Sequence, residues 1–222
     1  MIREVLQNLL MGIRPLSRLA LRFHRGMGEE TGPAEDIFRR FTVSAPVAGK
    51  RVLEIGPGKG WALGKLALQA GVSGYTGADV APYLGSEGAL ACHLFDGRRL
   101  PFPDASFDLV WSVAAFEHFR HPREMILEIQ RVLCPGGILF CDVDLRDHYH
   151  LAQEALWLDC LRHPEWQWRL MTWYRSGYVN RLRLPDWEAM FHQAAFEAVS
   201  LKPYESALLG QVISFEAVMR RA

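Results

Sequence analysis

A glycine-rich turn directly behind an apolar strand is the feature that most restricts the fold of this sequence. Residues 51–55 read Arg-Val-Leu-Glu-Ile, which is apolar and β-branched enough for a buried strand. Gly56, Gly58 and Gly60 follow at every second position, so three side chains are missing where the chain must turn sharply. The pattern predicts that a ligand approaches the backbone closely at this turn.

Short apolar strands alternate with helical patterns along the rest of the chain. Strands are expected at residues 51–55, 75–78, 91–95, 107–112, 138–143, 197–201 and 212–219. A helix is expected to begin at the glycine turn, and residues 134–137, Cys-Pro-Gly-Gly, are expected to stop the helix before the fifth strand. This order predicts an α/β fold: a Rossmann-like seven-stranded sheet that is mostly parallel, with an antiparallel last strand.

Acidic residues stand at or beside the ends of three of these strands. Glu54 precedes the first glycine, and Asp79 and Asp96 follow the second and third strands. The carboxyl ends of parallel strands meet at one edge of a sheet, and ligands bind there. The spacing G-x-G-x-G differs from the G-x-G-x-x-G of dinucleotide sites, and the carboxylate of Glu54 would repel a phosphate. A cationic or hydroxyl-rich ligand is therefore expected instead of a dinucleotide.

The positions of Asp79 and Asp96 restrict the type of ligand further. Asp79 lies roughly 20 residues beyond the turn, where an acid can accept hydrogen bonds from both ribose hydroxyls. Asp96 is placed to accept from the amine of an adenine. These contacts describe an adenosine with a small charged tail and no phosphate. S-adenosylmethionine, with its sulfonium and its amino-acid end, fits that description.

Four sequence blocks between residues 50 and 144 resemble a known family. They are VLEIGPGKG, GADV, FDGRRLPFPDASFDLVWSVAAFEHF and RVLCPGGILFCDV, and they occur in this order. The blocks are similar to those of class I S-adenosylmethionine-dependent methyltransferases, in particular the small-molecule enzymes of type 11. The resemblance implies S-adenosylmethionine as the cofactor and methyl transfer as the reaction.

The same resemblance implies a set of cofactor contacts. The methionine portion would lie against the glycine turn, the ribose on Asp79, and the adenine beside Asp96 and Gly97. The segment from Ser112 to Ala114 would line the methyl-transfer site. The matching positions are Glu54, Gly56, Pro57, Gly58, Gly60, Asp79, Val80, Asp96, Gly97, Ser112, Val113 and Ala114.

Two groups of residues could supply a general base for an oxygen or nitrogen acceptor, because such an acceptor gains from losing its proton as it attacks. Glu117 and His118 follow the fourth strand, and Asp144, Asp147 and His148 follow the fifth. We expect His148 to be the base, assisted by Asp144 or Asp147, with His118 as its competitor. His118 could instead only orient a loop.

The second group has two other interpretations. Its charges could cap the following helix, with Asp147 as the N-cap residue. Three acids and two histidines between residues 142 and 150 could also hold a magnesium ion against a sugar diol. Because no distant residue completes such a ligand set, no metal is expected.

An aromatic insert departs from the minimal cofactor fold at residues 146–184. Beyond His150, six aromatic residues of the insert are interleaved with arginines: Trp157, Trp166, Trp168, Trp173, Tyr174 and Tyr178. They predict either a packed helical lid or a platform on which sugars stack. Together with the DLRDHYH run, the insert is similar to methyltransferases of bacterial polysaccharide and glycolipid assembly.

The N-terminal residues 1–45 are predicted to form a helical cap on a methyltransferase domain at residues 46–222. Apolar residues recur at helical spacing over residues 5–23, and five arginines oppose one acid, Glu4, in the first 25 residues. The segment is either a cap packed on the domain or a helix that touches a membrane surface peripherally. Residues 26–36 are expected to form a loop.

Composition excludes several classes of partner. Lys+Arg and Asp+Glu are both 25, so no overall charge attracts nucleic acid. No run reaches the roughly 18 apolar residues of a membrane span, and there is no signal-peptide pattern, so a cytoplasmic protein is expected. The four cysteines lack metal-ligand spacing and are expected to be reduced, small buried residues.

The sequence therefore predicts transfer of a methyl group to a hydroxyl of a small-molecule or glycan-like acceptor. Two alternatives stay open at this point. One is a lipid or quinone methyltransferase at a membrane surface, which would use the basic N-terminal segment. The other is a protein that binds S-adenosylmethionine without turning it over.

Overall fold

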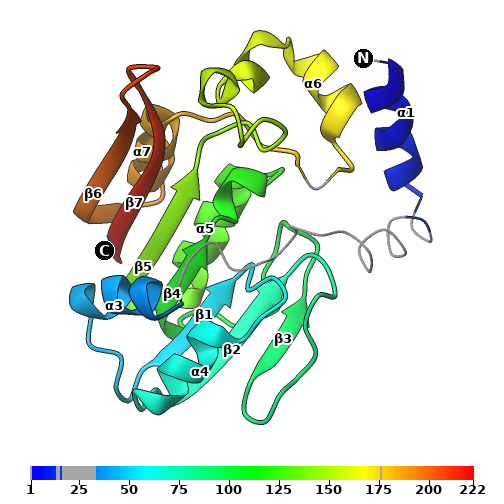
Figure 1. Cartoon of the computed structure of the whole chain (residues 1–222). Helices are drawn as coiled ribbons and strands as arrows, with labels where there is room; N and C mark the ends of the chain where they lie inside the picture. Colours follow the sequence, from blue (N-terminus) through cyan, green and yellow to red (C-terminus); the bar gives the residue numbers. More distant parts are fainter. Residues whose placement is uncertain (1, 14–15, 17–33, 176) are drawn as a thin grey trace.

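The computed structural model describes residues 2–13, 16, 34–175 and 177–222, and a seven-stranded sheet runs through its centre (Figure 1). The strands are β1 (Arg51–Ile55), β2 (Gly74–Asp79), β3 (Ala91–Leu94), β4 (Phe107–Val113), β5 (Leu133–Asp144), β6 (Phe196–Ser206) and β7 (Gln211–Arg221). Their order is β3-β2-β1-β4-β5-β7-β6. Strands β1 to β5 pair in parallel, and β7 pairs antiparallel with both β5 and β6. The predicted fold class is confirmed.

Helices cover both faces of the sheet. The described helices are α1 (Ile2–Met11), α3 (Ala34–Ser44), α4 (Ala62–Gln69), α5 (Pro122–Val132), α6 (Glu165–Thr172) and α7 (Leu184–Gln193), with short 3₁₀ turns η1 (Phe116–His118), η2 (Glu154–Leu156) and η3 (Asp159–Arg162). Of these, α3 and α4 cover one face of the sheet, and α5 and α7 cover the other. Alternate residues of β1 point to opposite faces, so Val52 packs with α3 and α4 while Leu53 and Ile55 pack with α5 and α7. Two apolar cores, one on each face, hold the sheet edge in place.

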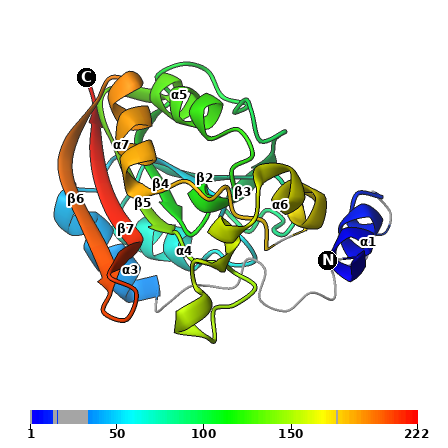
Figure 2. The same ribbon diagram turned by 90° about the horizontal axis from the view of Figure 1, so that it is seen from above.

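The insert and α1 form a third, smaller core away from the sheet. It contains Cys160, Trp168, Met171, Tyr178 and Val179. Val5 of α1 packs against this core, and α1 lies beside α6 in both views (Figures 1 and 2). The predicted N-terminal cap is therefore two separate pieces: α1 rests on the insert, whereas α3 rests on the sheet.

Strand β5 begins five residues earlier than predicted, at Leu133. The Cys-Pro-Gly-Gly run was expected to separate helix from strand, and this was wrong because the run lies inside the strand as a bulge. Phe107 pairs with Leu133 and Leu109 with Ile138, so four residues of β5 oppose one of β4. Gly136, with φ +74°, permits the distortion.

The loop expected at residues 26–36 is only partly described. Residues 26–33 lie outside the described residues, and Ala34 to Asp36 belong to the first turn of α3 instead of a loop. Glu35 and Asp36 favour this start because carboxylates near a helix N-terminus interact favourably with the helix dipole.

The cysteines follow the predicted pattern only in part. Cys141 and Cys160 are buried, whereas Cys92 and Cys134 are half-buried, and all four are free thiols. The Cys134 sulfur lies 3.1 Å from an Arg51 nitrogen and 3.1 Å from the Ala105 carbonyl oxygen, so it has polar neighbours.

Phe41 packs α3 against the sheet, and truncation of its side chain should lower the stability of the protein. Its ring is 2 % exposed, and its centroid lies 5.0 Å from that of Trp111 and 3.9 Å from that of Phe140. Phe41→Ala should lower the free energy of unfolding by about 3–5 kcal/mol in urea titrations. Val43→Ala, at a side chain that is 83 % exposed on the same helix, should change it by less than about 0.5 kcal/mol. Equal effects of the two changes would show that α3 does not belong to the core.

Candidate active site

The glycine turn after β1 is pressed against the segment that follows β4. Gly56 and Gly58 have φ values of +72° and +67°, a conformation that favours glycine. A Cβ at position 56 would lie 2.6 Å from the Cβ of Ala115, which is closer than real side chains approach. The sequence pattern and the structure therefore agree that nothing larger than glycine fits at Gly56.

Asp79 ends β2 beside this turn, as predicted. Its side chain is 6 % exposed and accepts hydrogen bonds from the backbone N–H groups of Gly58 (3.4 Å) and Ala81 (3.0 Å). Burial raises the pKa of this carboxyl to about 6, although the backbone donors oppose the shift. Asp79 is thus a buried acid with only weakly satisfied oxygens next to the glycine backbone.

Glu54 points to the face of the sheet that α3 and α4 cover. It is 6 % exposed, and the Tyr75 hydroxyl donates a hydrogen bond of 2.6 Å to its Oε2 atom. The protein itself therefore holds the carboxylate of Glu54. Gly56, Pro57, Gly58 and Gly60 follow Glu54 in the sequence.

Asp96 and Gly97 follow β3 at the same edge, and Asp96 is exposed. Its Oδ1 atom accepts hydrogen bonds from the backbone N–H groups of Arg98 (2.8 Å) and Arg99 (2.9 Å), which hold the pKa of the carboxyl below its usual range. Gly97 has φ +79°, and a Cβ there would lie 3.4 Å from Val80, whose side chain is 57 % exposed. An apolar surface therefore lies between the two acids.

Ser112, which was expected to line the methyl-transfer site, lies near the end of β4. It is fully buried, and its hydroxyl donates a 3.0 Å hydrogen bond to the Ile55 carbonyl, so the side chain fastens β4 to β1. Val113 and Ala114 come next, and Ala114 has φ +47°, which strains a residue with a Cβ. Its N–H donates to the Asp142 carbonyl at 2.9 Å. Backbone atoms, not the Ser112 hydroxyl, are what this segment presents to the edge.

Four of the five predicted catalytic side chains come together beyond β4 and β5. His148 Nε2 lies 3.5 Å from Asp144 Oδ2 and 4.0 Å from Glu117 Oε1. The rings of His118 and His148 meet edge to face, with their centroids 4.9 Å apart. These residues, Glu117, His118, Asp144 and His148, are called the polar cluster below.

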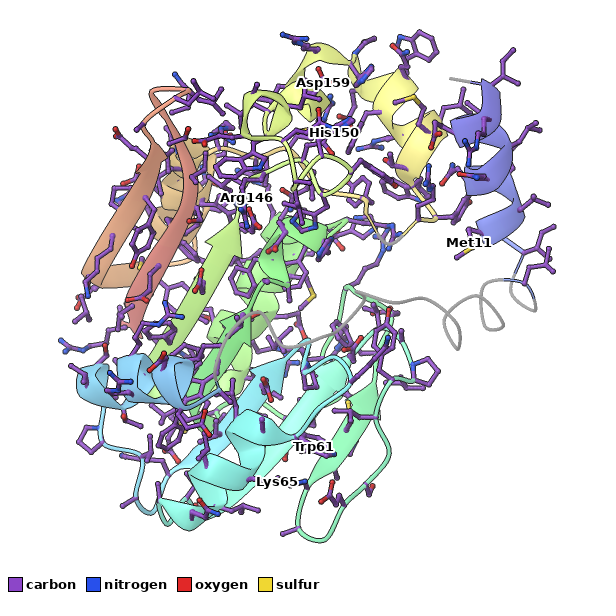
Figure 3. The ribbon with its side chains drawn as sticks, viewed as in Figure 1. Met11, Trp61, Lys65, Arg146, His150 and Asp159 are labelled. Carbon is purple, nitrogen blue, oxygen red and sulfur yellow. The ribbon has the colours of Figure 1, made fainter. Side chains whose placement is uncertain are left out.

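Asp147 is the exception. It is 2 % exposed, its Oδ1 accepts from the Tyr149 N–H at 2.9 Å, and it shares a separate group with His150 and Asp159. Figure 3 shows His150 and Asp159 in the insert, above Arg146. Asp147 therefore does not cap a helix, and Asp144 is the acid beside His148. Nothing in the spacing of the sequence pointed to Asp159.

Glu117 is the most unusual member of the polar cluster. Its side chain is 1 % exposed, and neither carboxylate oxygen has a hydrogen-bond partner within the described part of the chain. Burial, together with the nearby charge of Asp144, holds the pKa of Glu117 well above its ordinary value. A buried acid without donors is costly, so this position favours a ligand that supplies them.

Asp144 carries the negative charge of the polar cluster. Burial acts to raise its pKa, but the neighbouring His148 and the Arg146 guanidinium outweigh it and hold the pKa below its usual range. Arg146 Nη2 donates to Asp144 Oδ2 at 2.7 Å. Sequence reasoning missed Arg146 as a partner, although it lies only two positions from Asp144.

The insert fixes His118 and η1 through backbone groups. His118 Nδ1 lies 2.6 Å from the Tyr178 carbonyl, which can only accept, so Nδ1 carries the proton and Nε2 keeps its lone pair. The Asn180 N–H donates to the Glu117 carbonyl at 2.7 Å, and the Asn180 side chain donates to Phe116 at 2.9 Å. The sequence carried no signal for Tyr178 or Asn180 in this role.

Two groups among the described residues could each offer three metal ligands. One comprises Glu117, His118 and His148, and the other Asp147, His150 and Asp159. The magnesium arrangement considered for residues 142–150 does not form, because Asp142 pairs with Arg40 at 3.1 Å and Asp147 lies apart from Asp144.

The central part of the chain is similar to a known protein family. Residues 53–141 match a family model described as a methyltransferase domain. Over these residues the chain is similar to methyltransferase domains. The matched region contains the glycine turn, the acids that follow β2 and β3, and Glu117 and His118. It ends before Asp144, His148 and the insert.

Curated relatives are methyltransferases of mycobacteria. A phthiotriol/phenolphthiotriol dimycocerosates methyltransferase of Mycobacterium tuberculosis is 33 % identical over 128 residues, which cover 53 % of this chain and 46 % of the relative. A fatty-acid O-methyltransferase of Mycolicibacterium smegmatis is 33 % identical over 128 residues, covering 53 % and 45 %. The chain thus spans less than half the length of these relatives in the match.

Solved structures share the fold. An S-adenosylmethionine-dependent methyltransferase from Mesorhizobium loti has a TM-score of 0.62 and 19 % sequence identity, over 86 % of this chain and 99 % of the other. At that identity the likeness shows the fold alone.

His118 should remain neutral at pH values where an ordinary histidine is charged. Burial, followed by the neighbouring His148, lowers its pKa to about 4. A titration followed by NMR should place the midpoint of the His118 ring signals near pH 4. A midpoint near 6.5, the usual value for histidine, would show that the ring is open to water.

Proposed function

We propose that this chain binds S-adenosylmethionine and transfers its methyl group to an oxygen of a small-molecule acceptor. The observation that carries the proposal is one juxtaposition: the glycine turn and Asp79 lie at the same sheet edge as the polar cluster. The match to a methyltransferase domain over residues 53–141 supports it. When bound, the cofactor supplies an activated methyl group on its sulfonium.

The residues present fit this cofactor. The glycines leave the backbone of the turn open, and Asp79 is a buried acceptor that accepts from the backbone N–H groups of Ala81 at 3.0 Å and Gly58 at 3.4 Å. We assign the methionine portion to Glu54, Gly56, Pro57, Gly58 and Gly60, the ribose to Asp79, and the adenine to Val80, Asp96 and Gly97. Val113 and Ala114 would face the methyl group through their backbone, and Ser112 holds that backbone in place.

We assign to His148 the role of the general base that takes the proton from the acceptor oxygen. Asp144, 3.5 Å away, can stabilise the imidazolium that forms, and Arg146 keeps Asp144 ionised. His118 is the weaker candidate because its Nδ1 is tied to the insert and its pKa is about 4. Glu117, whose pKa is raised by burial, can in its protonated form donate a hydrogen bond to an acceptor oxygen. General-base assistance of this kind contributes about 10²- to 10⁴-fold to a rate.

The acceptor itself is the finer part of the proposal. A hydroxyl of a small or glycan-like molecule was expected from the sequence. Four of the six aromatic rings do not support a sugar-stacking platform, because guanidinium groups lie over Trp157, Trp168 and Trp173, and Trp168 and Tyr178 are buried; Trp166 and Tyr174 are exposed. Those four rings support a packed lid instead.

A lipid acceptor is the second candidate, and the names of the relatives favour it. Those names refer to phthiotriol dimycocerosates and to a fatty acid. Methylation at a membrane surface by a cytoplasmic protein would bring such an acceptor to the polar cluster. A chain that binds the cofactor without turnover is the remaining alternative, and a broad acceptor panel that yields no methylated product would support it.

Asp79→Ala should weaken S-adenosylmethionine binding about ten- to a hundredfold, because two ribose hydroxyls lose a charged acceptor worth about 1.5–3 kcal/mol. Isothermal titration calorimetry measures this directly. Asp36→Ala, at an exposed acid on α3, is the matched control and should leave the affinity unchanged. If the Asp79→Ala variant binds S-adenosylmethionine with wild-type affinity, the assignment of the ribose to Asp79 is wrong.

The affinity of the wild-type protein should also fall as the pH drops below about 6. The raised pKa of Asp79 means that the carboxyl takes up a proton in that range and stops accepting from both hydroxyls. Calorimetry between pH 5 and pH 8 would show the dependence, and Asp79→Ala should flatten it. A pH-dependence that persists unchanged in the variant would assign the effect to another group.

His148→Ala should reduce turnover about 10²-fold or more while cofactor affinity and folding stay intact. The reason is that the acceptor oxygen loses the group that takes its proton. His118→Ala is the internal comparison. If His118→Ala abolishes turnover and His148→Ala stays within about threefold of wild type, the two roles are reversed.

A further inference from the structure

Helix α1 turns a polar side toward the protein. Asn8 is 2 % exposed; its side-chain nitrogen donates to the carbonyls of Leu170 (2.9 Å) and Arg169 (3.4 Å), and its oxygen accepts from the Tyr174 N–H at 2.6 Å. Glu4 forms an ion pair with Arg175. These contacts satisfy backbone groups near the end of α6 and fix the rotation of α1 about its own axis.

The apolar side of α1 consequently faces outward. Its exposed residues are Ile2 (75 %), Leu6 (57 %), Leu9 (52 %), Leu10 (53 %) and, just after the helix, Ile13 (49 %). Their spacing of three and four positions places them on one side of the helix. An amphipathic helix that serves only as a packed cap buries this side; here the polar side is buried and the apolar side is exposed.

Helix α6 extends the exposed apolar surface. Trp166 (67 %), Leu170 (42 %) and Tyr174 (50 %) recur at every fourth position. The apolar residues of α1 lie near those at and after α6. The Leu170 carbonyl accepts a hydrogen bond from the Asn8 side chain, and a Cβ on Gly12 would lie 3.0 Å from the Tyr174 ring. The α1–α6 face is defined here as these eight side chains: Ile2, Leu6, Leu9, Leu10, Ile13, Trp166, Leu170 and Tyr174.

Positive charge lies close to the α1–α6 face in the sequence. The first 25 residues contain five arginines and one acid, and that acid, Glu4, is neutralised by Arg175. On α6, Glu165 is paired with both Arg169 and Arg181. An apolar helical surface that includes tryptophan and tyrosine and is adjacent in sequence to several arginines is typical of helices that lie in the interface of a bilayer.

We propose that the α1–α6 face docks onto the surface of an anionic lipid bilayer. No helix in the described ranges is long and apolar enough to cross a membrane, and α1 has 10 residues. In this proposal α1 therefore lies on the membrane surface. A second copy of the chain is the less favourable occupant, because a symmetric contact would bring together two copies of α1, each of which is continuous with an arginine-rich stretch of the sequence.

The position of the face gives it a function in the proposed reaction. The insert that carries α6 also supplies Tyr178 and Asn180, which hold His118 and Glu117. Docking would therefore place the polar cluster close to the membrane from which a lipid acceptor enters. The docking itself does not rest on methyl transfer, since vesicle binding requires neither cofactor nor acceptor.

The test is co-sedimentation of the full chain with vesicles. Binding is expected with vesicles of phosphatidylcholine and phosphatidylglycerol, and at least tenfold weaker binding with phosphatidylcholine alone. The double change Leu6→Gln and Leu10→Gln should weaken binding to the anionic vesicles at least tenfold. Leu127→Gln with Leu208→Gln, at leucines that are 55 % and 65 % exposed elsewhere, is the matched control and should bind as wild type does.

Cofactor titrations on the same variants separate the two proposals. Both double variants should bind S-adenosylmethionine as wild type does, so a failure of vesicle binding leaves the cofactor site untouched, and the converse also holds. The docking proposal is overturned if wild type does not sediment with anionic vesicles, or if both double variants lose binding equally. Dimerisation that Leu6→Gln and Leu10→Gln abolish, without vesicle binding, would assign the face to a second copy.

Discussion

The close approach of Gly56 to Ala115 is the contact on which the site depends. It brings the turn after β1 against the segment after β4, at a separation that a single methyl group on Gly56 would prevent. The turn can then place the Gly58 N–H on Asp79, and the segment after β4 can lead directly into η1 with Glu117 and His118. One backbone approach thus sets the distance between the assigned cofactor contacts and the polar cluster.

The polar cluster is stabilised from a different part of the chain. Burying Glu117 without hydrogen-bond donors is unfavourable, and the protein offsets this with the apolar cores beneath the sheet edge and the backbone contacts of Tyr178 and Asn180. The insert therefore holds part of the polar cluster in place. It fixes the tautomer of His118 and the position of η1, and through α6 it carries the α1–α6 face.

Local sequence patterns predicted the sheet and the edge well. Glycine spacing and strand-end acids depend on short-range chemistry, so Gly56, Gly58, Asp79 and Asp96 lie where the sequence placed them. The patterns did not predict that the Ser112 hydroxyl would donate to the carbonyl of Ile55 on a neighbouring strand, because that contact is set by the pairing register of the strands. Arg146 was overlooked although it is close in sequence, and Asn180 and the outward rotation of α1 depend on partners far along the chain.

The central claim is that one sheet edge holds the cofactor with its methyl group toward the polar cluster, and a crystal structure with S-adenosylhomocysteine tests it most directly. We expect the ribose hydroxyls within about 3.2 Å of the Asp79 carboxylate and the sulfur facing Glu117 and His148. A nucleoside bound elsewhere would contradict the claim. The cavity of about 440 Å³ between α5 and α7, lined in part by His121 and Met190, is one such place.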